Sequence, residues 1–281
     1  NKGLGTLRSF VLPGGTPANP KIAGALVVAP AMLKTKTHGR YPAAEAALAA
    51  MAEGAQVDVD TALRIESRYL ASLMTGPVAR NMVNTFFFNL NAIRAGQSRP
   101  QGVPRYRPGK VGILGAGMMG AGMAYAQASR GIATVLKDVS LDKAEHGKAH
   151  SQRLTQQRVD KGRMSPPEQQ ALLAHITPTA EPADLKGCEL IIEAVFEQRE
   201  LKARVTREAE PWLAEGGFLA SNTSTLPIAG LAQASGQPRK FVGIHFFSPV
   251  DKMKLVEIVR GPQTDDETVA RAYDYVLALG K

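Results

Sequence analysis

Two side chains in the last third of the sequence have the types and spacing needed to take a proton from a hydroxyl group. His245 lies in an apolar run, and Glu257 follows twelve residues later in the next one. An imidazole takes up a proton near neutral pH, and a neighbouring carboxylate orients it and stabilises its charged form. His245 is therefore a candidate general base partnered by Glu257, with a structural histidine at a strand end as the alternative. No second His or Cys lies near His245 in the sequence, which argues against a metal site.

A glycine-rich loop indicates a second kind of chemistry, the binding of a pyrophosphate. The apolar run Val111–Leu114 is followed by Gly115, Gly117 and Gly120 in the spacing GxGxxG, and then by small side chains. In this context the first glycine allows a tight turn, the second lets the backbone approach the phosphates, and the third lets helix and strand pack closely. The amino end of the helix adds free N–H groups and a positive dipole. The segment therefore predicts a dinucleotide site.

Asp138 completes the dinucleotide pattern. It follows the apolar run Ala133–Lys137 and lies 23 residues after Gly115. A carboxylate at this point can accept hydrogen bonds from the ribose hydroxyls and would repel a 2′-phosphate, so the residues favour NAD over NADP. A glycine-rich turn with an acid nearby by chance is the alternative.

A hydroxyl- and amide-rich segment follows a later apolar run, at residues 221–225. Ser224 and Asn222 are candidates to hydrogen-bond a substrate oxygen or the nicotinamide amide. The alternative is a helix cap, because Thr225 directly precedes Leu226-Pro227.

Two further sets of charges could meet a ligand or simply face solvent. Glu197 and Lys202 follow the apolar run Leu190–Val195, and at a spacing of five they do not form a standard helical ion pair, so both are candidates to face the cofactor. A predicted polar helix and the residues after it carry a basic face that could meet phosphate groups. Its members are Arg153, Arg158, Lys161 and Arg163.

The elements that must position these residues alternate between short apolar strands and helices after residue 110. The predicted strands are Val111–Leu114, Ala133–Lys137, Leu190–Val195, Gly217–Ser221, Phe241–Phe246 and Leu255–Val259. Capping boxes that begin at Ser165 and Thr264 predict two helix starts. This alternation predicts an α/β fold, a doubly wound, mostly parallel Rossmann-type sheet. Ligands of such sheets bind at the carboxyl ends of the strands, where the glycine loop, Asp138, the 221–225 segment and His245 lie.

The first part of the chain has a different pattern. Residues 1–40 show weak periodicity, and the apolar spacing that follows predicts helices over Pro42–Glu53, Thr61–Met74 and a third stretch from Gly76-Pro77. Ala95 to Gly109, with three prolines, three glycines and no acid, is predicted to be an exposed connector. The sequence therefore divides into a helical region (1–95), a connector (96–109) and an α/β domain (110–281).

Composition narrows the class of protein further. The 281 residues carry a formal net charge of +9, of which residues 1–109 supply +8, with 13 basic and 5 acidic side chains. This excess could face nucleic acid, acidic lipid or a phosphorylated substrate, but a solvated surface or one covered by a partner domain is favoured, and no nucleic-acid-binding motif is present. The longest mostly apolar run, Ile22 to Leu33, has twelve residues, fewer than the roughly 20 of a membrane-spanning helix. A single cysteine, Cys188, favours a reducing compartment.

From about residue 108 to the end, the chain closely resembles the 3-hydroxyacyl-CoA dehydrogenase family. The motifs that carry the resemblance, in this order, are GILGAGMMGAGMA, VLKD, EAVFE, ASNTSTLPI and HFFSPVDKMKLVEIVRG. The helical region more loosely resembles the connecting region of multifunctional fatty-acid oxidation alpha subunits, in which a crotonase-like enoyl-CoA hydratase domain precedes the dehydrogenase. The resemblance implies oxidation of (S)-3-hydroxyacyl-CoA by NAD in beta-oxidation.

The resemblance also implies roles for single residues. His245 is the base, Glu257 its partner, and Ser224 touches both the substrate hydroxyl and the cofactor. Ser248 stands by the nicotinamide, where relatives often have the longer Asn. The other residues implied to bind NAD are Met119, Asp138, Val195, Phe196, Glu197 and Lys202, with the glycines of the loop.

The same resemblance sets expectations for the whole protein. Relatives continue past the final residues into a helical domain that completes the acyl site, and the chain begins at Asn1 rather than Met, so a longer protein is expected. A thiolase subunit and further copies of the chain are the expected partners, in the cytoplasm of a bacterium or an organelle matrix of a eukaryote. Two other classes stay open: a different 3-hydroxyacid-type NAD dehydrogenase that uses a Lys base, and a non-catalytic NAD-binding protein.

Overall fold

The computed structural model describes residues 15–281, and the chain divides into two units at residues 97 and 98. Residues 1–14, which the sequence placed at the start of the helical region, lie outside the described residues. None of the helices formed by residues 15–281 combines the length and apolar character that spanning a membrane requires.

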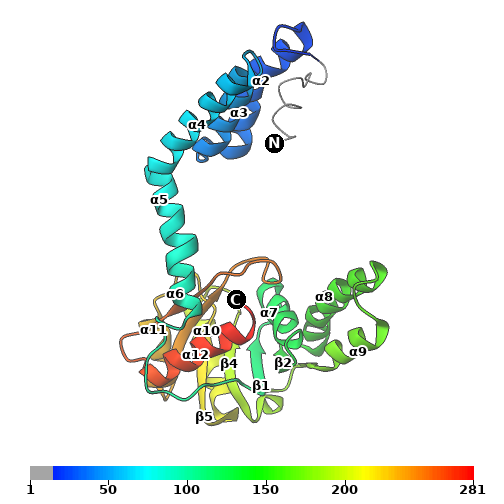
Figure 1. Ribbon diagram of the computed structural model, residues 1–281. Helices are drawn as coiled ribbons and strands as arrows, with labels where there is room; N and C mark the ends of the chain where they lie inside the picture. The colour runs from blue at the N-terminus through cyan, green and yellow to red at the C-terminus, as the bar shows by residue number, and fades with distance from the viewer. Residues whose placement is uncertain (1–14) are drawn as a thin grey trace. The chain divides into compact units, whose positions relative to one another are not determined.

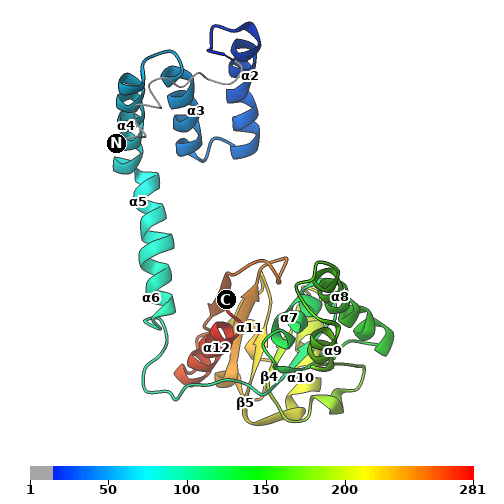
Figure 2. The same cartoon turned by 45° about the vertical axis from the view of Figure 1, so that its right-hand side comes forward.

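The described part of the first unit is built from helices (Figure 1). They are α2 (Pro20–Thr37), α3 (Pro42–Gly54), α4 (Val59–Thr75), α5 (Pro77–Val83), the π-helix η1 (Asn84–Asn89) and α6 (Leu90–Arg94). The three predicted helices are confirmed, and Figure 2 shows α5 continuing through the π-helical turn into α6. The sequence missed α2, because Gly24 and Pro30 interrupt its pattern, although Asn19 caps its start and Pro20 occupies its first position.

The second unit is a seven-stranded sheet with helices around it (Figure 1). The strands are β1 (Lys110–Leu114), β2 (Ala133–Lys137), β3 (Ile176–Thr179), β4 (Cys188–Glu193), β5 (Leu213–Ser221), β6 (Phe241–Phe246) and β7 (Val256–Val259). The α-helices are α7 (Met118–Ala128), α8 (Leu141–Asp160), α9 (Pro166–Ala174), α10 (Arg199–Ala209), α11 (Ile228–Ala232) and α12 (Asp266–Ala278). Short 3₁₀ turns are η2 (Pro182–Leu185), η3 (Glu210–Trp212) and η4 (Pro238–Lys240).

The strand order is β3-β2-β1-β4-β5-β6-β7, and all neighbours are parallel except β6 and β7. The chain leaves β1 toward β2 and β3 and then returns to place β4 on the other side of β1. This reversal makes a topological switch point between β1 and β4, where doubly wound sheets bind ligands. The predicted Rossmann-type, mostly parallel sheet is confirmed.

Both faces of the sheet are buried, which explains why its strands are apolar without alternation. Ile192 packs in one core cluster with Ala124 of α7 and Tyr275 of α12. Its neighbour Ile191 packs in the other cluster with Ile228 of α11. Successive strand residues therefore face opposite layers of helices, and the sheet holds its carboxyl edge rigidly for the site.

Most residues of the connector are exposed, as predicted, whereas Gly96, Arg99 and Pro108 are buried. The expectation of an exposed segment is wrong for Arg99, whose side chain is only 7% exposed and pairs with Asp274 of α12. Both oxygens of that carboxylate accept hydrogen bonds from the Arg99 guanidinium at 2.8 Å, and the Tyr106 N–H adds another at 2.9 Å. The proline and glycine content predicted the turns of this segment. The Arg99–Asp274 pair joins residues 175 positions apart, so no local sequence pattern indicates it.

Two smaller expectations are also corrected. Strand β3 was not predicted because it has four residues and contains Pro178, which an edge strand tolerates. The capping box at Ser165 is confirmed, but the cap of α12 is Asp265, which accepts a hydrogen bond from the Thr268 N–H. Thr264 instead donates its hydroxyl to the Phe241 carbonyl at 2.6 Å.

Candidate active site

The glycine loop joins β1 to α7 as the sequence predicted, and each glycine has a physical reason. Gly115 has a φ of +98°, a conformation that L side chains rarely adopt. A Cβ on Gly120 would lie 1.8 Å from the Gly115 carbonyl oxygen, so helix and loop could not pack. A Cβ on Gly117 would meet no atom within 4 Å and would project into open space where a ligand can approach.

A cleft of about 760 Å³ opens beside this loop. The cleft is lined by Gly115, Gly117 and Met119 of the glycine loop and α7. Asp138 at the end of β2 lines it too, as do Val195 and Phe196 after β4. Its basic and acidic lining includes Lys137, Asp142, Lys143, His146, Arg204 and Glu208. The glycine cradle, the free amino end of α7 and an acid at the end of β2 fit the phosphates and ribose of a dinucleotide.

Asp138 also organises the loop. Its Oδ2 accepts a hydrogen bond from the Ala116 N–H at 2.7 Å, and its Oδ1 accepts one from the Val139 N–H at 2.7 Å. The carboxylate thus ties the end of β2 to the glycine loop of β1, at the rim of the cleft.

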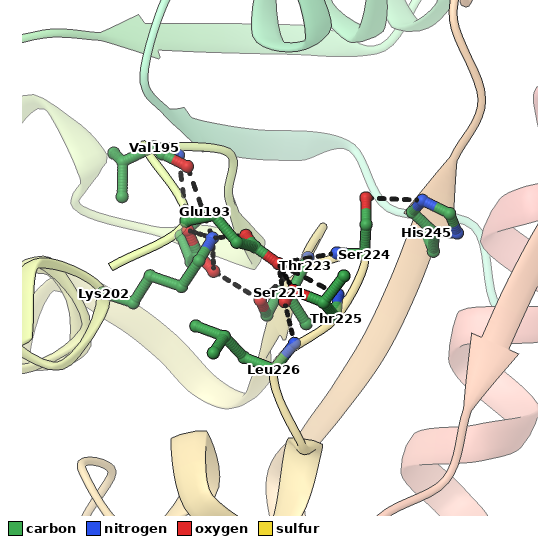
Figure 3. Close-up of polar contacts among 10 residues, drawn as sticks. Glu193, Val195, Lys202, Ser221, Thr223, Ser224, Thr225, Leu226 and His245 are labelled. Carbon is green, nitrogen blue, oxygen red and sulfur yellow. Dashed lines mark hydrogen bonds and ion pairs between the residues drawn. The ribbon is translucent and has the colours of Figure 1, made fainter. Parts of the chain in front are cut away.

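His245 and Glu257 are directly opposite each other in the antiparallel pair β6–β7. Nδ1 of His245 lies 2.9 Å from Oε2 of Glu257, and Nε2 lies 3.0 Å from Oγ of Ser224. Because a carboxylate only accepts, the proton of the neutral ring resides on Nδ1 and Nε2 is left to accept from Ser224. Figure 3 shows the Ser224 hydroxyl directed at this ring nitrogen. The structure therefore brings together the three residues predicted to be catalytic.

Glu197 and Lys202 take places that the sequence did not foresee. Lys202 is only 2% exposed, and its Nζ lies 2.9 Å from both carboxylate oxygens of Glu193, a residue the sequence analysis did not consider (Figure 3). Nζ is also 3.1 Å from Oε2 of Glu197. Neither Glu197 nor Lys202 lines the cleft. The signal that could have found Glu193 is a charged residue at the end of a buried apolar strand, where it needs a partner.

The electrostatics of this cluster follow from burial and pairing. Burial raises the pKa of Glu193 above its ordinary value, although Lys202 and the Ser221 hydroxyl act against this. Partial burial would also raise the pKa of Glu197. Hydrogen bonds from Thr223 and Thr225, together with the Lys202 ammonium, outweigh burial and lower that pKa to about 2.

The side chains of Asn222 and Ser248 contact neighbouring segments close to His245. The Asn222 side-chain oxygen accepts a hydrogen bond from the Phe246 N–H at 2.8 Å, so this oxygen ties β5 to β6. Ser248 precedes a cis peptide bond to Pro249, and its Oγ lies 3.6 Å from Sδ of Met118. The loop after β6 therefore adjoins the glycine loop.

Lys161 lies neither in the cleft nor beside His245, Glu257 and Ser224. It lines a second groove of about 610 Å³. Arg158 and Arg163 of the predicted basic face line it too, with Lys252 and Asp251 from the loop after β6; Arg153 does not. Four cations and one acid therefore line this groove. Among residues 15–281, no cluster of three His, Cys, Asp or Glu side chains could hold a metal ion.

Along the carboxyl edge of the sheet, the site residues follow the strand order. Asp138 follows β2, and the glycine loop follows β1. Val195 and Phe196 come after β4, Ser224 comes after β5, and His245 lies in β6. Adjacent strands are about 4.8 Å apart, so this edge presents an extended binding surface rather than a point.

Comparison with known proteins agrees with this geometry. Residues 110–281 match the family described as 3-hydroxyacyl-CoA dehydrogenase, NAD binding domain. The crystal structure of (S)-3-hydroxybutyryl-CoA dehydrogenase from Ralstonia eutropha is 35% identical, with a TM-score of 0.60, over 62% of this chain and 62% of that chain. A 3-hydroxybutyryl-CoA dehydrogenase from Escherichia coli is 30% identical, with a TM-score of 0.60, over 63% of this chain and 37% of that one.

A third similar structure is the dehydrogenase part of multifunctional enzyme 1 from C. elegans, at 27% identity and a TM-score of 0.57, over 64% of this chain and 41% of that one. The chain therefore spans less than two thirds of the length of these relatives. More than half of it, residues 110–281, matches the family. Residues 110–281 are an NAD-binding domain, and the chain belongs to the 3-hydroxyacyl-CoA dehydrogenase family.

Proposed function

We propose that the protein containing this chain oxidises (S)-3-hydroxyacyl-CoA to 3-ketoacyl-CoA and that His245, Glu257 and Ser224 carry the reaction. One observation carries the proposal: Nε2 of His245 lies 3.0 Å from Ser224 Oγ while Nδ1 lies 2.9 Å from Glu257 Oε2. An acceptor nitrogen held beside a hydroxyl group is the arrangement that a general base for an alcohol requires.

NAD would be held by the glycine loop, Asp138 and the Val195–Phe196 segment. When bound there, NAD would supply the acceptor for the hydride that leaves C3 of the hydroxyacyl group. His245 Nε2 takes the hydroxyl proton, and the Glu257 carboxylate stabilises the imidazolium that results. Ser224 positions the substrate oxygen against Nε2. Lys161, with Arg158 and Arg163, would hold phosphates of coenzyme A in the second groove, where these cations converge.

The same proposal extends to the whole protein. The resemblance of the helical region to the connecting region of multifunctional alpha subunits supports a hydratase upstream, a role in beta-oxidation and assembly with a thiolase. Residues 1–95 would then follow the hydratase, 96–109 connect, and 110–281 be the dehydrogenase. Self-association and a reducing compartment, cytoplasm or organelle matrix, belong to this proposal.

The test is reduction of acetoacetyl-CoA by NADH in the complete protein, followed by NADH absorbance. We expect His245→Gln to lower kcat by roughly 10²–10⁴-fold, with NADH affinity unchanged because His245 does not line the cleft. His175→Gln, at the end of α9, is the matched control. Equal activity on free 3-hydroxyacids and their CoA esters would instead indicate a different NAD dehydrogenase, and NADH binding without turnover a non-catalytic protein.

A further inference from the structure

Three charged side chains pair with one another beside the turn that carries Ser224. Glu193, at the end of β4, and Lys202 of α10 are 3% and 2% exposed and make a two-oxygen contact at 2.9 Å. Lys202 Nζ also contacts Oε2 of Glu197 at 3.1 Å. Removing charges from water is costly, and an arrangement of this kind persists only where each charge is paired and hydrogen-bonded.

Glu193 is tied to β5 as well as to Lys202. The register pairs it with Ser221 on the adjacent parallel strand, and the Ser221 hydroxyl donates to its Oε1. The Glu193 carbonyl accepts a hydrogen bond from the Asn222 N–H at 2.9 Å. Both the backbone and the side chain of Glu193 therefore fix the point at which the turn leaves β5.

Glu197 holds the turn itself. While its Oε2 faces Lys202, its Oε1 accepts hydrogen bonds from the Ser224 N–H at 2.9 Å and the Thr225 N–H at 3.0 Å. The Thr223 hydroxyl donates to the same oxygen. Figure 3 shows the turn residues Thr223, Ser224 and Thr225 between Lys202 and His245. One carboxylate thus gathers three consecutive residues, and the middle one is Ser224.

We propose that Glu193, Lys202 and Glu197 form a charged clamp that positions the Ser224 hydroxyl at Nε2 of His245. The inference rests on the roles proposed above for Ser224 and His245. It assigns a function to Glu193, and it makes Glu197 and Lys202 positioning residues that act through Ser224. The Lys202 ammonium lies between the two carboxylates and links the turn, α10 and the end of β4.

The test compares Glu197→Ala, which removes the acceptor, with Glu197→Gln, which keeps one oxygen for the Ser224 and Thr225 N–H groups. Three quantities are measured in the complete protein: kcat, the dissociation constant of NADH, and the imidazole nitrogen resonances of His245 by NMR without substrate. We expect Glu197→Ala to lower kcat by about 10- to 100-fold through misplacement of Ser224, and Glu197→Gln to restore part of it. Because kcat is measured at saturating NADH, this loss is separate from any change in NADH affinity, and the Nε2 resonance moves toward its position in Ser224→Ala.

A double substitution separates the clamp from other roles. In the Ser224→Ala background, Glu197→Ala should cause no further loss of kcat, because its effect passes through Ser224. Additive losses would overturn the clamp. An effect confined to the NADH dissociation constant would also overturn it and would make Glu197 a direct cofactor ligand. If Ser224→Ala itself leaves kcat and the Nε2 resonance unchanged, the proposed role of Ser224 fails first.

Substitution of the buried residues Glu193 and Lys202 risks unfolding the protein, so the test also needs variants that keep every charge. Lys202→Met should reproduce Glu197→Ala, but it leaves Glu193 buried without its counter-charge. Thr223→Val and Thr223→Ser keep all charges, and only the first removes the hydroxyl donor to Glu197. We expect Thr223→Val to shift the His245 Nε2 resonance and Thr223→Ser to leave it in place; equal spectra for the two variants would contradict the clamp.

Discussion

At the scale of single residues, the pairing of His245 with Glu257 follows from strand register. Residues directly opposite in an antiparallel pair project from the same face, so an imidazole and a carboxylate at these positions meet without long side chains. The two differ in environment, since the His245 side chain is 16% exposed and that of Glu257 54%. The ring is held in the protein while its partner remains solvated and able to carry charge.

Removing the charge of Glu257 tests this pairing. We expect Glu257→Gln to lower kcat by about 10- to 100-fold, because a hydrogen bond to a charged group contributes about 1.5–3 kcal/mol and the variant cannot stabilise the imidazolium. The measurement is kcat for acetoacetyl-CoA reduction, with Glu215→Gln on the exposed part of β5 as control. An unchanged kcat would remove Glu257 from the mechanism.

The lowered pKa of Glu197 makes stability depend on pH. Its folded-state pKa is about 2 against an ordinary value of 4.5, so its contribution is complete above 4.5 and is lost as pH falls toward 2. We expect the free energy of unfolding of the wild type to fall more steeply over this window than that of Glu197→Gln. Denaturant titrations at several pH values measure the difference, and parallel curves would contradict it.

At the scale of elements, the β1–α7 loop separates two uses of glycine. Gly120 lets the helix pack on the loop, whereas Gly117 leaves space that no protein atom fills. The motif predicts these two different uses, and the structure confirms that only Gly120 is needed for packing.

Alanine at each position distinguishes the two uses. We expect Gly117→Ala to change the free energy of unfolding by less than about 1 kcal/mol yet weaken NADH binding roughly tenfold, equivalent to 1.4 kcal/mol. Gly120→Ala should destabilise the fold by about 1–3 kcal/mol, because α7 must shift. Thermal unfolding and NADH fluorescence measure these quantities. Unimpaired NADH binding by Gly117→Ala would mean that no ligand approaches there.

The connector and α12 are joined by Asp274. Burial would raise the pKa of this carboxyl, but hydrogen bonds from Arg99, the Tyr106 N–H and Arg105 together lower it. The Arg105 side chain is 71% exposed, whereas that of Arg99 is 7% exposed. The two arginines therefore offer a matched comparison of a buried and a solvated pair.

We expect Arg99→Met to lower the free energy of unfolding of the α/β unit by about 1.5–3 kcal/mol, the cost of losing hydrogen bonds to a buried charge. Arg105→Met should cost less than about 1 kcal/mol, as exposed pairs do. Urea denaturation of the two variants gives both values. Equal losses would show that the connector is not held through Arg99.

At the scale of the whole molecule, one edge of one sheet gathers the three candidate catalytic residues and most of the candidate cofactor-binding residues. The strand order β2-β1-β4-β5-β6 places the acid, the glycine loop, the Val195 loop, the Ser224 turn and His245 in succession. All of them belong to the unit that begins at Ser98. Cofactor binding is therefore a property of that unit.

A fragment of residues 98–281 tests this division. We expect it to bind NADH with the same dissociation constant as the complete chain, because every residue that lines the cleft lies within it. Fluorescence titration measures binding, and circular dichroism reports folding. A folded fragment that fails to bind would show that the helical unit contributes to the cofactor site.

The sequence predicted what depends on local spacing. The glycine loop, Asp138 after the second strand and the His245 segment each combine a motif with a strand end, and both strand and motif are encoded within a few residues. Helix α2, strand β3 and the cap of α12 were missed or misplaced because their local patterns are weak or ambiguous.

The tertiary structure alone decided which charges are buried and what they hold. Lys202 faces two carboxylates instead of the cleft, the Asn222 oxygen ties two strands, and Arg99 reaches Asp274 across 175 residues. Charge burial depends on partners that the parallel crossovers bring from distant positions, and periodicity carries no record of those partners. The sequence by itself thus determined the kind of cofactor and predicted the candidate base, whereas packing determined how the serine beside His245 is held.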